Sequence, residues 1–308
     1  MISKSNKIFL AGHNGMVGSA ILKKLKNLGY KNIICVSKKK LNLLDQKKVE
    51  SFLKKKKPKV VIIAAARVGG ILANNNNKAN FLYENLTIQT NIIHGSFLAG
   101  VKNLIFLGSS CIYPKKTKQP IKESFFMTGP LENTNDAYAI AKITGVKMCM
   151  EYSKQYKLNY KTLMPANMFG ANDNYDLSSS HFFPALIRKI HNAKIRKKKF
   201  ITLWGNGKPK RELLYVEDFA DACVFFMRKK TKESFINIGS GVEKTIKGFA
   251  KYIMKRLNVN LKIKYDLTKP NGMQRKKLDL SISKKYGWKS KTSLNEAFEK
   301  VYLDYLKN

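Results

Sequence analysis

Short apolar runs alternate with helical patterns through the first half of the chain. The runs predict buried strands at residues 7–11, 32–37, 59–66, 103–107 and 160–165. Between them, hydrophobic residues recur with helical spacing and predict helices at 19–28, from 45 to about 57, at 81–98 and from 138 to about 157. Strands that alternate with helices in this way form parallel sheets. The pattern therefore predicts a doubly wound α/β domain over residues 1–165.

The alternation breaks down after residue 165. Short strands are predicted at residues 200–204, 213–216, 235–238 and 262–265, and helices at 182–193, 216–229, 245–257 and 294–306. No internal repeat or low-complexity linker separates these segments. We therefore expect residues 166–308 to form mainly a smaller substrate-binding domain, partly interleaved with the first and returning some segments to it.

Three glycines, Gly12, Gly15 and Gly18, lie between the first strand and the first helix. Such a loop allows a tight turn, close approach of the backbone to a pyrophosphate, and close packing of the helix on the strand. Backbone N–H groups at the start of the helix then point at the phosphates. A plain structural turn has the same glycines, but their place after the first strand favours a dinucleotide-binding loop.

The second predicted strand ends at Ser37 and Lys38. A cofactor with a free ribose 2′-hydroxyl usually meets Asp or Glu at this position. A hydroxyl and an ammonium are better suited to a 2′-phosphate, so NADP is favoured over NAD. The alternative is a solvated loop in a lysine-rich protein.

Ser109 follows the fourth predicted strand, and Tyr138 and Lys142 lie four residues apart on the next helix, where they share one face. A hydroxyl, a phenol and an ammonium are suited to moving a proton to or from a sugar oxygen while hydride moves at the carbon. The spacing alone is weak, because this composition gives about two Tyr-x-x-x-Lys pairs by chance. The second pair begins at Tyr265, precedes a proline and follows no helical pattern, so we interpret it as accidental.

The composition is 44% hydrophobic over 308 residues, which is typical of a soluble globular protein. No apolar run reaches about eighteen residues, so no transmembrane helix is predicted. Residues 1–7 are too short and polar for a signal peptide. The cysteines are scattered, which disfavours a disulfide framework or a metal site and favours reduced thiols in the cytoplasm. They are Cys35, Cys111, Cys149 and Cys223.

The formal charge of +39 has two interpretations. One is binding to nucleic acid or an acidic surface. The other is compositional drift toward lysine, because the lysines are spread along the chain without a nucleic-acid recognition motif or interleaved aromatic residues. We favour drift and expect neither a nucleic acid nor a membrane as partner. The charge still favours anionic ligands such as a nucleotide sugar and a phosphorylated dinucleotide.

Taken together, the glycine loop, Ser109, Tyr138 and Lys142 resemble the extended short-chain dehydrogenase/reductases, whose first domain is a Rossmann sheet. Nearly the whole chain is also similar to one branch of them, the GDP-L-fucose synthase family. The matching blocks include GHNGMVGSAI, LNLLD, AAARVGGI, GSSCIYP, YAIAK, WGNGKPKRELLYVED and KPNGMQRKKLD. The resemblance implies that one site epimerises C3 and C5 of GDP-4-keto-6-deoxy-D-mannose and then reduces C4 with NADPH. It also implies a homodimer through helices that flank the sheet. A related GDP-deoxyhexose is the alternative substrate.

The resemblance assigns epimerisation to Cys111 as base and His181 as acid. In the sequence alone, such a cysteine is more often a buried structural thiol, and a lone histidine after three serines is more often a surface or capping residue. The resemblance also implies that Ser109 and Tyr138 bind the enolate oxygen, and that Lys142 lowers the pKa of Tyr138 and holds the nicotinamide ribose. The predicted catalytic residues are Ser109, Cys111, Tyr138, Lys142 and His181.

The family's binding residues map onto positions throughout this chain. For NADP they are Gly12, His13, Asn14, Gly15, Met16, Val17, Gly18, Lys38, Leu41, Asn42, Leu43, Leu107, Gly108, Ser109, Ser110, Tyr138, Lys142, Pro165, Ala166, Asn167, Met168 and His181. For substrate they are Lys189, Trp204, Arg211 and Asp279. Lys189 stands where the family more typically has arginine, with Arg188 as a potential helper, and Asn14 replaces a basic residue, so we expect Lys38 to take over the 2′-phosphate.

Overall fold

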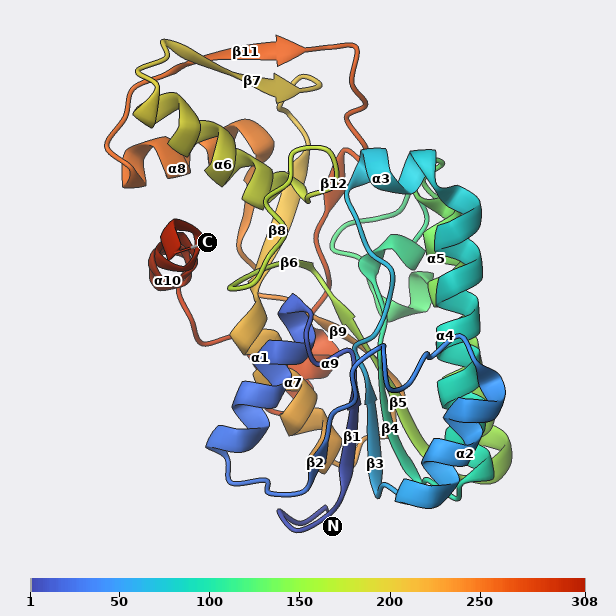
Figure 1. The fold of residues 1–308 in the computed structure, drawn as a ribbon. Coiled ribbons are helices and arrows are strands. Elements are labelled where there is room, and N and C mark those ends of the chain that lie inside the picture. The colour runs from blue at the N-terminus through green and yellow to red at the C-terminus, as the bar shows by residue number, and fades with distance from the viewer. Residues whose placement is uncertain (1, 308) are drawn as a thin grey trace.

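The computed structural model describes residues 2–307. Met1 and Asn308, the outer ends of the two predicted domains, lie outside this range. Figure 1 shows a lower lobe built on one sheet and an upper lobe of small sheets and helices. Among residues 2–307, no helix combines the length and apolar character needed to span a bilayer.

The central sheet of the lower lobe is parallel and has six strands. They are β1 (Ile8–Ala11), β2 (Ile33–Ile34), β3 (Val60–Ile63), β4 (Asn103–Leu107), β5 (Asn159–Pro165) and β9 (Phe235–Ile238). Their order is β2-β1-β3-β4-β5-β9, so the chain reverses its direction of travel between β1 and β3. Every residue of β1 and β3 is buried. Continuous burial requires apolar residues on both faces of these strands, because helices cover both sides of the sheet.

Helices pack on the two faces of this sheet. On one face α1 (Met16–Asn27) packs against α7 (Val216–Arg228). The other face carries α2 (Gln46–Lys56), α4 (Lys78–Leu98) and α5 (Asp136–Tyr156), with α3 (Ile71–Asn76) just before α4 (Figure 1). Since α7 and β9 come late in the sequence, the chain returns to this lobe after leaving it.

The upper lobe contains two small sheets. β6 (Asn167–Phe169), β8 (Lys210–Tyr215), β10 (Glu243–Thr245) and β12 (Arg275–Lys276) form one, and β7 (Phe200–Trp204) pairs with β11 (Lys262–Asp266) in the other. The chain after β6 also forms α6 (Phe182–Ile195), α8 (Ile246–Arg256), α9 (Ser281–Lys285) and α10 (Leu294–Lys307), of which α9 contacts β9 of the lower lobe. In this lobe α6 packs against α8 (Figure 1).

The predicted elements differ from the observed ones mainly at their ends. The strands predicted at 32–37 and 59–66 are wrong in length, because only Ile33–Ile34 and Val60–Ile63 pair with neighbours. The helices predicted from residues 19, 81 and 138 begin two or three residues earlier, at Met16, Lys78 and Asp136. Some of the shortest elements, such as β12 with two residues and α3 with six, were not predicted, because they are too short to display a period.

The three glycines of the loop after β1 differ in how closely other backbone atoms approach them. Gly12 has φ +85°, and a Cβ there would lie 2.5 Å from the Ala65 nitrogen. A Cβ on Gly18 would lie 1.9 Å from the Gly12 carbonyl oxygen, so α1 packs directly on the loop. Gly15 caps α1, and a Cβ there would meet only the Gly12 oxygen, at 3.7 Å. Gly12 and Gly18 are therefore required by packing, whereas Gly15 leaves space above the helix N-terminus.

The substitution Gly18→Ala is expected to lower the free energy of unfolding by about 1–3 kcal/mol, because the new methyl group overlaps the loop backbone. Gly15→Ala is the matched control and is expected to stay within about 1 kcal/mol of the wild type, since its methyl group makes ordinary contact. Urea denaturation measures both values. Equal losses in the two variants would contradict the packing assigned to Gly18.

Candidate active site

The ends of several strands bring the candidate residues to one edge of the sheet. Gly12 follows β1, Gly108 follows β4 and Ala166 follows β5. The N–H of Gly108 donates to the Leu163 carbonyl at 2.9 Å, and the N–H of Ala166 donates to Ile238 at 2.9 Å, so pairing continues to the edge. Ligands of doubly wound sheets bind at this carboxyl edge, beside the point where the strand order reverses.

Ser109 and Cys111 form a compact turn after β4. The chain enters a short 3₁₀ helix, Ser110–Ile112, capped by Ser109. The Ser109 hydroxyl accepts the Cys111 N–H at 3.3 Å and donates to the Cys111 Sγ at 3.0 Å. Cys111 is half-buried, in contrast to the buried Cys149 and Cys223. Its thiol therefore lies at the sheet edge and is not part of the core packing.

Tyr138 and Lys142 lie one turn apart on α5, and the structure brings both to Ser109. The Tyr138 hydroxyl is hydrogen-bonded to Ser109. Lys142 is 3% exposed, its Nζ donates to the Leu107 carbonyl at 2.9 Å, and it lies 5.8 Å from the centre of the Tyr138 ring. By contrast, Tyr265 of the second Tyr-x-x-x-Lys pair lies in β11, which confirms that this pair is accidental.

Burial controls the ionisation of this pair. It raises the pKa of Tyr138 far above its usual value, and negative charge on Cys111 adds to this, while the hydrogen bond between Tyr138 and Ser109 opposes it. Burial lowers the pKa of Lys142 to about 8, and charge on Cys111 opposes that shift. The family resemblance implies that Lys142 lowers the pKa of Tyr138, but here burial shifts that pKa upward. The phenol therefore stays protonated at neutral pH and is ready to donate a proton.

His181 stands at the N-cap position of α6, where its side chain makes no capping hydrogen bond. The preceding segment is fixed to the loop before α3, because the Gly70 N–H donates to the Ser179 carbonyl at 2.8 Å. His181 is exposed by its surface area, but enough protein lies around its imidazole to desolvate it. Partial desolvation lowers its pKa, and the positive charge of Lys276 lowers it further. His181 therefore lies within electrostatic range of Lys276, which is itself next to Cys111.

Lys189 and Trp204 come together in the upper lobe. The Lys189 Nζ donates to the Thr202 carbonyl at 3.0 Å and lies 5.5 Å from the centre of the Trp204 ring. Arg188, the potential helper, instead donates to the Tyr175 carbonyl at 3.0 Å. An ammonium beside an indole face is suited to a ligand that carries both phosphate and an aromatic base.

Arg211 and Asp279 are held by nearby backbone groups. The Arg211 Nη1 donates to the Met273 carbonyl at 2.6 Å and to the Lys210 carbonyl at 2.8 Å. A carboxylate oxygen of Asp279 accepts the Ser281 N–H at 2.9 Å. Each side chain is thus oriented without using all of its hydrogen-bonding capacity. This arrangement leaves both groups available to a polar ligand.

Lys276, which lies on β12, was not among the residues predicted from the sequence. It is 9% exposed, and its Nζ lies 4.0 Å from the Cys111 Sγ. The residue sits inside the matching block KPNGMQRKKLD, which is the only signal that pointed to it. In a chain with 59 lysines and arginines, no local pattern distinguishes a buried lysine from an exposed one.

The residues of the glycine loop fit a phosphorylated dinucleotide. The open space at Gly15 lies at the N-terminus of α1, where no side chain caps the helix, so its first N–H groups are available to phosphate. Lys38 is exposed in the segment after β2, and buried Leu41 anchors that segment. Within residues 2–307, no group of His, Cys, Asp and Glu side chains is arranged to hold a metal ion.

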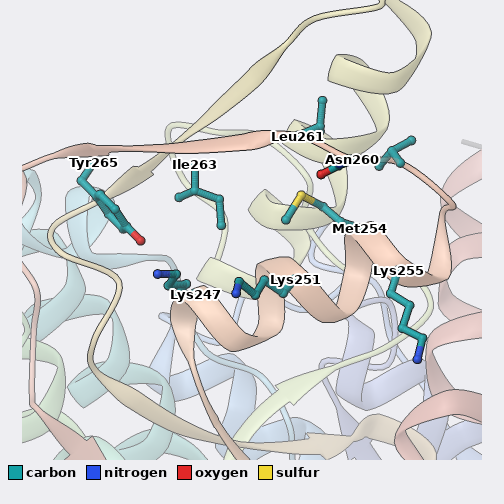
Figure 2. A pocket seen from close by; sticks show the side chains of 9 residues that line it. Lys247, Lys251, Met254, Lys255, Asn260, Leu261, Ile263 and Tyr265 are labelled. Atoms are coloured by element: carbon teal, nitrogen blue, oxygen red, sulfur yellow. The ribbon is translucent and has the colours of Figure 1, made fainter.

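A separate hollow of about 530 Å³ lies between α8 and β11 (Figure 2). Three lysines line it, Lys247, Lys251 and Lys255, with Tyr265 at one end. None of its lining residues is a candidate catalytic residue. The hollow is a basic part of the surface and not the reaction centre.

Comparison with known proteins agrees with this geometry. Residues 8–239 match the NAD dependent epimerase/dehydratase family. The chain is 47% identical to GDP-L-fucose synthase 1 of Arabidopsis thaliana, covering 100% of this chain and 95% of that protein. It is 42% identical to the GDP-L-fucose synthase of Escherichia coli K12, covering 98% and 97%. Among solved structures, MlghC, a GDP-mannoheptose C4 reductase from Campylobacter jejuni with NADP bound, has a TM-score of 0.90 at 33% identity, covering 99% and 100%. The chain belongs to the NAD dependent epimerase/dehydratase family, within its GDP-L-fucose synthase branch.

Proposed function

We propose that this chain is an NADPH-dependent enzyme that converts GDP-4-keto-6-deoxy-D-mannose to GDP-L-fucose. It epimerises C3 and C5 and reduces C4 at one site. The observation that carries the proposal is the position of the Ser109 hydroxyl, hydrogen-bonded to both the Cys111 thiol and the Tyr138 phenol. Ser109 therefore links the thiol that would remove a proton from carbon to the phenol that would donate a proton to oxygen. The names of the curated relatives support the same activity.

Epimerisation begins with removal of a proton from a carbon next to the ketone. The Cys111 thiolate takes this proton, and the C–H electron pair moves into the ring to form an enolate with its charge on O4. Ser109 and Tyr138 donate hydrogen bonds to that oxygen. The His181 imidazolium then returns a proton to the opposite face of the carbon, and the electron pair moves back to restore the ketone. The sugar gains no net proton, and Cys111 and His181 exchange protons with solvent before the next cycle.

Reduction uses the same oxygen and the same phenol. NADPH, when bound, supplies a hydride to C4. Tyr138 donates its proton to O4 as the alkoxide forms, which its raised pKa allows at neutral pH. Lys142, held by the Leu107 carbonyl, stabilises the resulting phenolate with its positive charge. The cofactor is held by the loop of residues 12–18, by Lys38 at the 2′-phosphate and by the sheet edge.

Four side chains of the upper lobe recognise the nucleotide sugar in this proposal. Lys189 binds the diphosphate and Trp204 contacts the guanine or ribose, which their close pairing supports. Arg211 and Asp279 bind sugar hydroxyls with the hydrogen-bonding capacity they retain.

The alternative to GDP-4-keto-6-deoxy-D-mannose as substrate is a related GDP-4-keto sugar. The resemblance of the fold to a GDP-mannoheptose C4 reductase favours this alternative. A GDP-heptose differs from GDP-4-keto-6-deoxy-D-mannose only in its sugar, so the two share the catalytic geometry described above. The identity of the product separates them.

Incubation with GDP-4-keto-6-deoxy-D-mannose and NADPH is expected to consume one NADPH per sugar and to yield GDP-L-fucose. NMR of the isolated product identifies its configuration. A product that keeps the manno configuration would contradict the proposal. So would an enzyme that consumes NADPH with a GDP-4-keto-heptose but not with GDP-4-keto-6-deoxy-D-mannose.

The two half-reactions are expected to separate by mutation. Cys111→Ser should lower solvent deuterium exchange at C3 and C5 by about 10²–10⁴-fold while leaving NADPH binding unchanged. Tyr138→Phe should lower reduction by a similar factor while part of the exchange survives. Mass spectrometry follows exchange, and NADPH absorbance follows reduction. Full exchange in Cys111→Ser would place the base elsewhere.

We also propose that the protein is a homodimer formed through α4 and α5. Large apolar side chains are exposed on these helices in the single chain, with Tyr83 65% and Ile140 46% exposed. Their exposure supports a face that a second subunit covers in the dimer. Ile140→Glu is expected to give monomers in sedimentation equilibrium. Leu303→Glu on α10, where Leu303 is 59% exposed, is the matched control and should leave dimers intact. Dimers in both variants would refute this interface.

The cytoplasm is the proposed location of the enzyme. All four cysteines are free thiols, which is typical of a reducing compartment. Cell fractionation tests this, and recovery outside the cytoplasm would contradict it.

A further inference from the structure

Lys276 is a buried cation that the reaction scheme above does not use. It lies on β12, opposite Arg211 of the parallel strand β8. Its side chain is 9% exposed, and its Nζ is 4.0 Å from the Cys111 Sγ, within reach of a hydrogen bond donated to sulfur. Burial of an ammonium is costly unless a partner compensates it.

The charged groups around Lys276 leave Cys111 as its direct partner. Glu132 attracts it, but the Glu132 carboxylate forms an ion pair with Lys115 at 3.3 Å. Arg211 and His181 lie within electrostatic range, and both repel the ammonium when they are protonated. Negative charge on Cys111 stabilises the ammonium of Lys276, and by reciprocity the ammonium stabilises the thiolate.

The other buried lysine near Cys111 has a different partner. The Lys142 Nζ donates to the Leu107 carbonyl and lies 5.8 Å from the centre of the Tyr138 ring. Charge on Cys111 also acts on Lys142, but Lys142 donates its hydrogen bond to the Leu107 carbonyl, whereas the Lys276 Nζ reaches the Cys111 sulfur.

We propose that Lys276 is a positioning residue that holds Cys111 as a thiolate and fixes its Sγ for attack on the substrate proton, an inference that rests on the proposed function. Two donors then converge on the sulfur, the Ser109 hydroxyl at 3.0 Å and the Lys276 ammonium at 4.0 Å. When Sγ takes the proton from carbon, the negative charge passes to the enolate oxygen. Lys276 keeps its own proton throughout and loses only its counter-charge.

Alkylation of Cys111 by iodoacetamide without substrate tests this role, with mass spectrometry of the Cys111 peptide to separate it from other thiols. At about pH 7, Lys276→Met is expected to slow alkylation at least tenfold, because only the thiolate reacts. The rates of variant and wild type should converge at about pH 10, where an ordinary thiol ionises unaided. Lys276→Arg keeps the charge and should recover most of the rate. A rate for Lys276→Met within twofold of the wild type at pH 7, or an equal deficit at both pH values, would overturn the proposal.

Lys161→Met is the matched control for loss of a buried ammonium. Lys161 is 2% exposed, and its Nζ donates to the carbonyls of Phe226 and Lys229 at the end of α7. The variant is expected to unfold at lower urea concentration yet to alkylate at Cys111 at the wild-type rate. If it slows alkylation as much as Lys276→Met, the effect is general and the proposal fails.

Solvent deuterium exchange at C3 connects the thiolate to catalysis. Lys276→Met is expected to slow exchange by about the same factor as alkylation, with the affinity for NADPH unchanged. Slow alkylation with wild-type exchange would overturn the role in the reaction. If the wild type exchanges no GDP-4-keto sugar, the proposed function fails, whereas the alkylation comparison still decides whether Lys276 holds the Cys111 thiolate.

Discussion

The shared carboxyl edge of the parallel sheet is the constraint on which the site depends. Parallel strands end together, so the loops after β1, β4 and β5 must lie side by side, although they are far apart in the sequence. The glycine loop can approach this edge only because Gly12 and Gly18 have no side chains. The same edge fixes Ser109, and through Ser109 it fixes the positions of Cys111 and Tyr138.

Ser109 has one proton and several acceptors around it. In this structure the proton is directed to the Cys111 Sγ, while its oxygen accepts the Cys111 N–H. A ketone oxygen bound next to Tyr138 would compete with the sulfur for that proton. In the proposed mechanism, protonation of Cys111 by the substrate carbon weakens its sulfur as an acceptor, while the enolate oxygen becomes a stronger acceptor for the Ser109 hydroxyl. The proposed mechanism therefore uses the Ser109 hydroxyl in both epimerisation and reduction.

Continuous burial made much of the fold predictable from sequence. β4 was predicted from the apolar run at residues 104–107, and the Tyr265 pair was excluded because a proline follows it and it belongs to no helical pattern. Lys276 could not be predicted, because its burial comes from strand pairing with β8 and not from any local pattern. The role of Cys111 was predicted only through the family resemblance, because its local sequence pattern does not separate it from the buried Cys149 and Cys223.

The most direct test of the account is the pattern of isotope in a single product. The enzyme is incubated in deuterated water with unlabelled NADPH and GDP-4-keto-6-deoxy-D-mannose, and the product is analysed by NMR. The account predicts deuterium at C3 and at C5, introduced by the acid–base pair, and hydrogen at C4, delivered from the cofactor. Deuterium at C4, or hydrogen retained at either C3 or C5, would contradict a single site that epimerises C3 and C5 and then reduces C4.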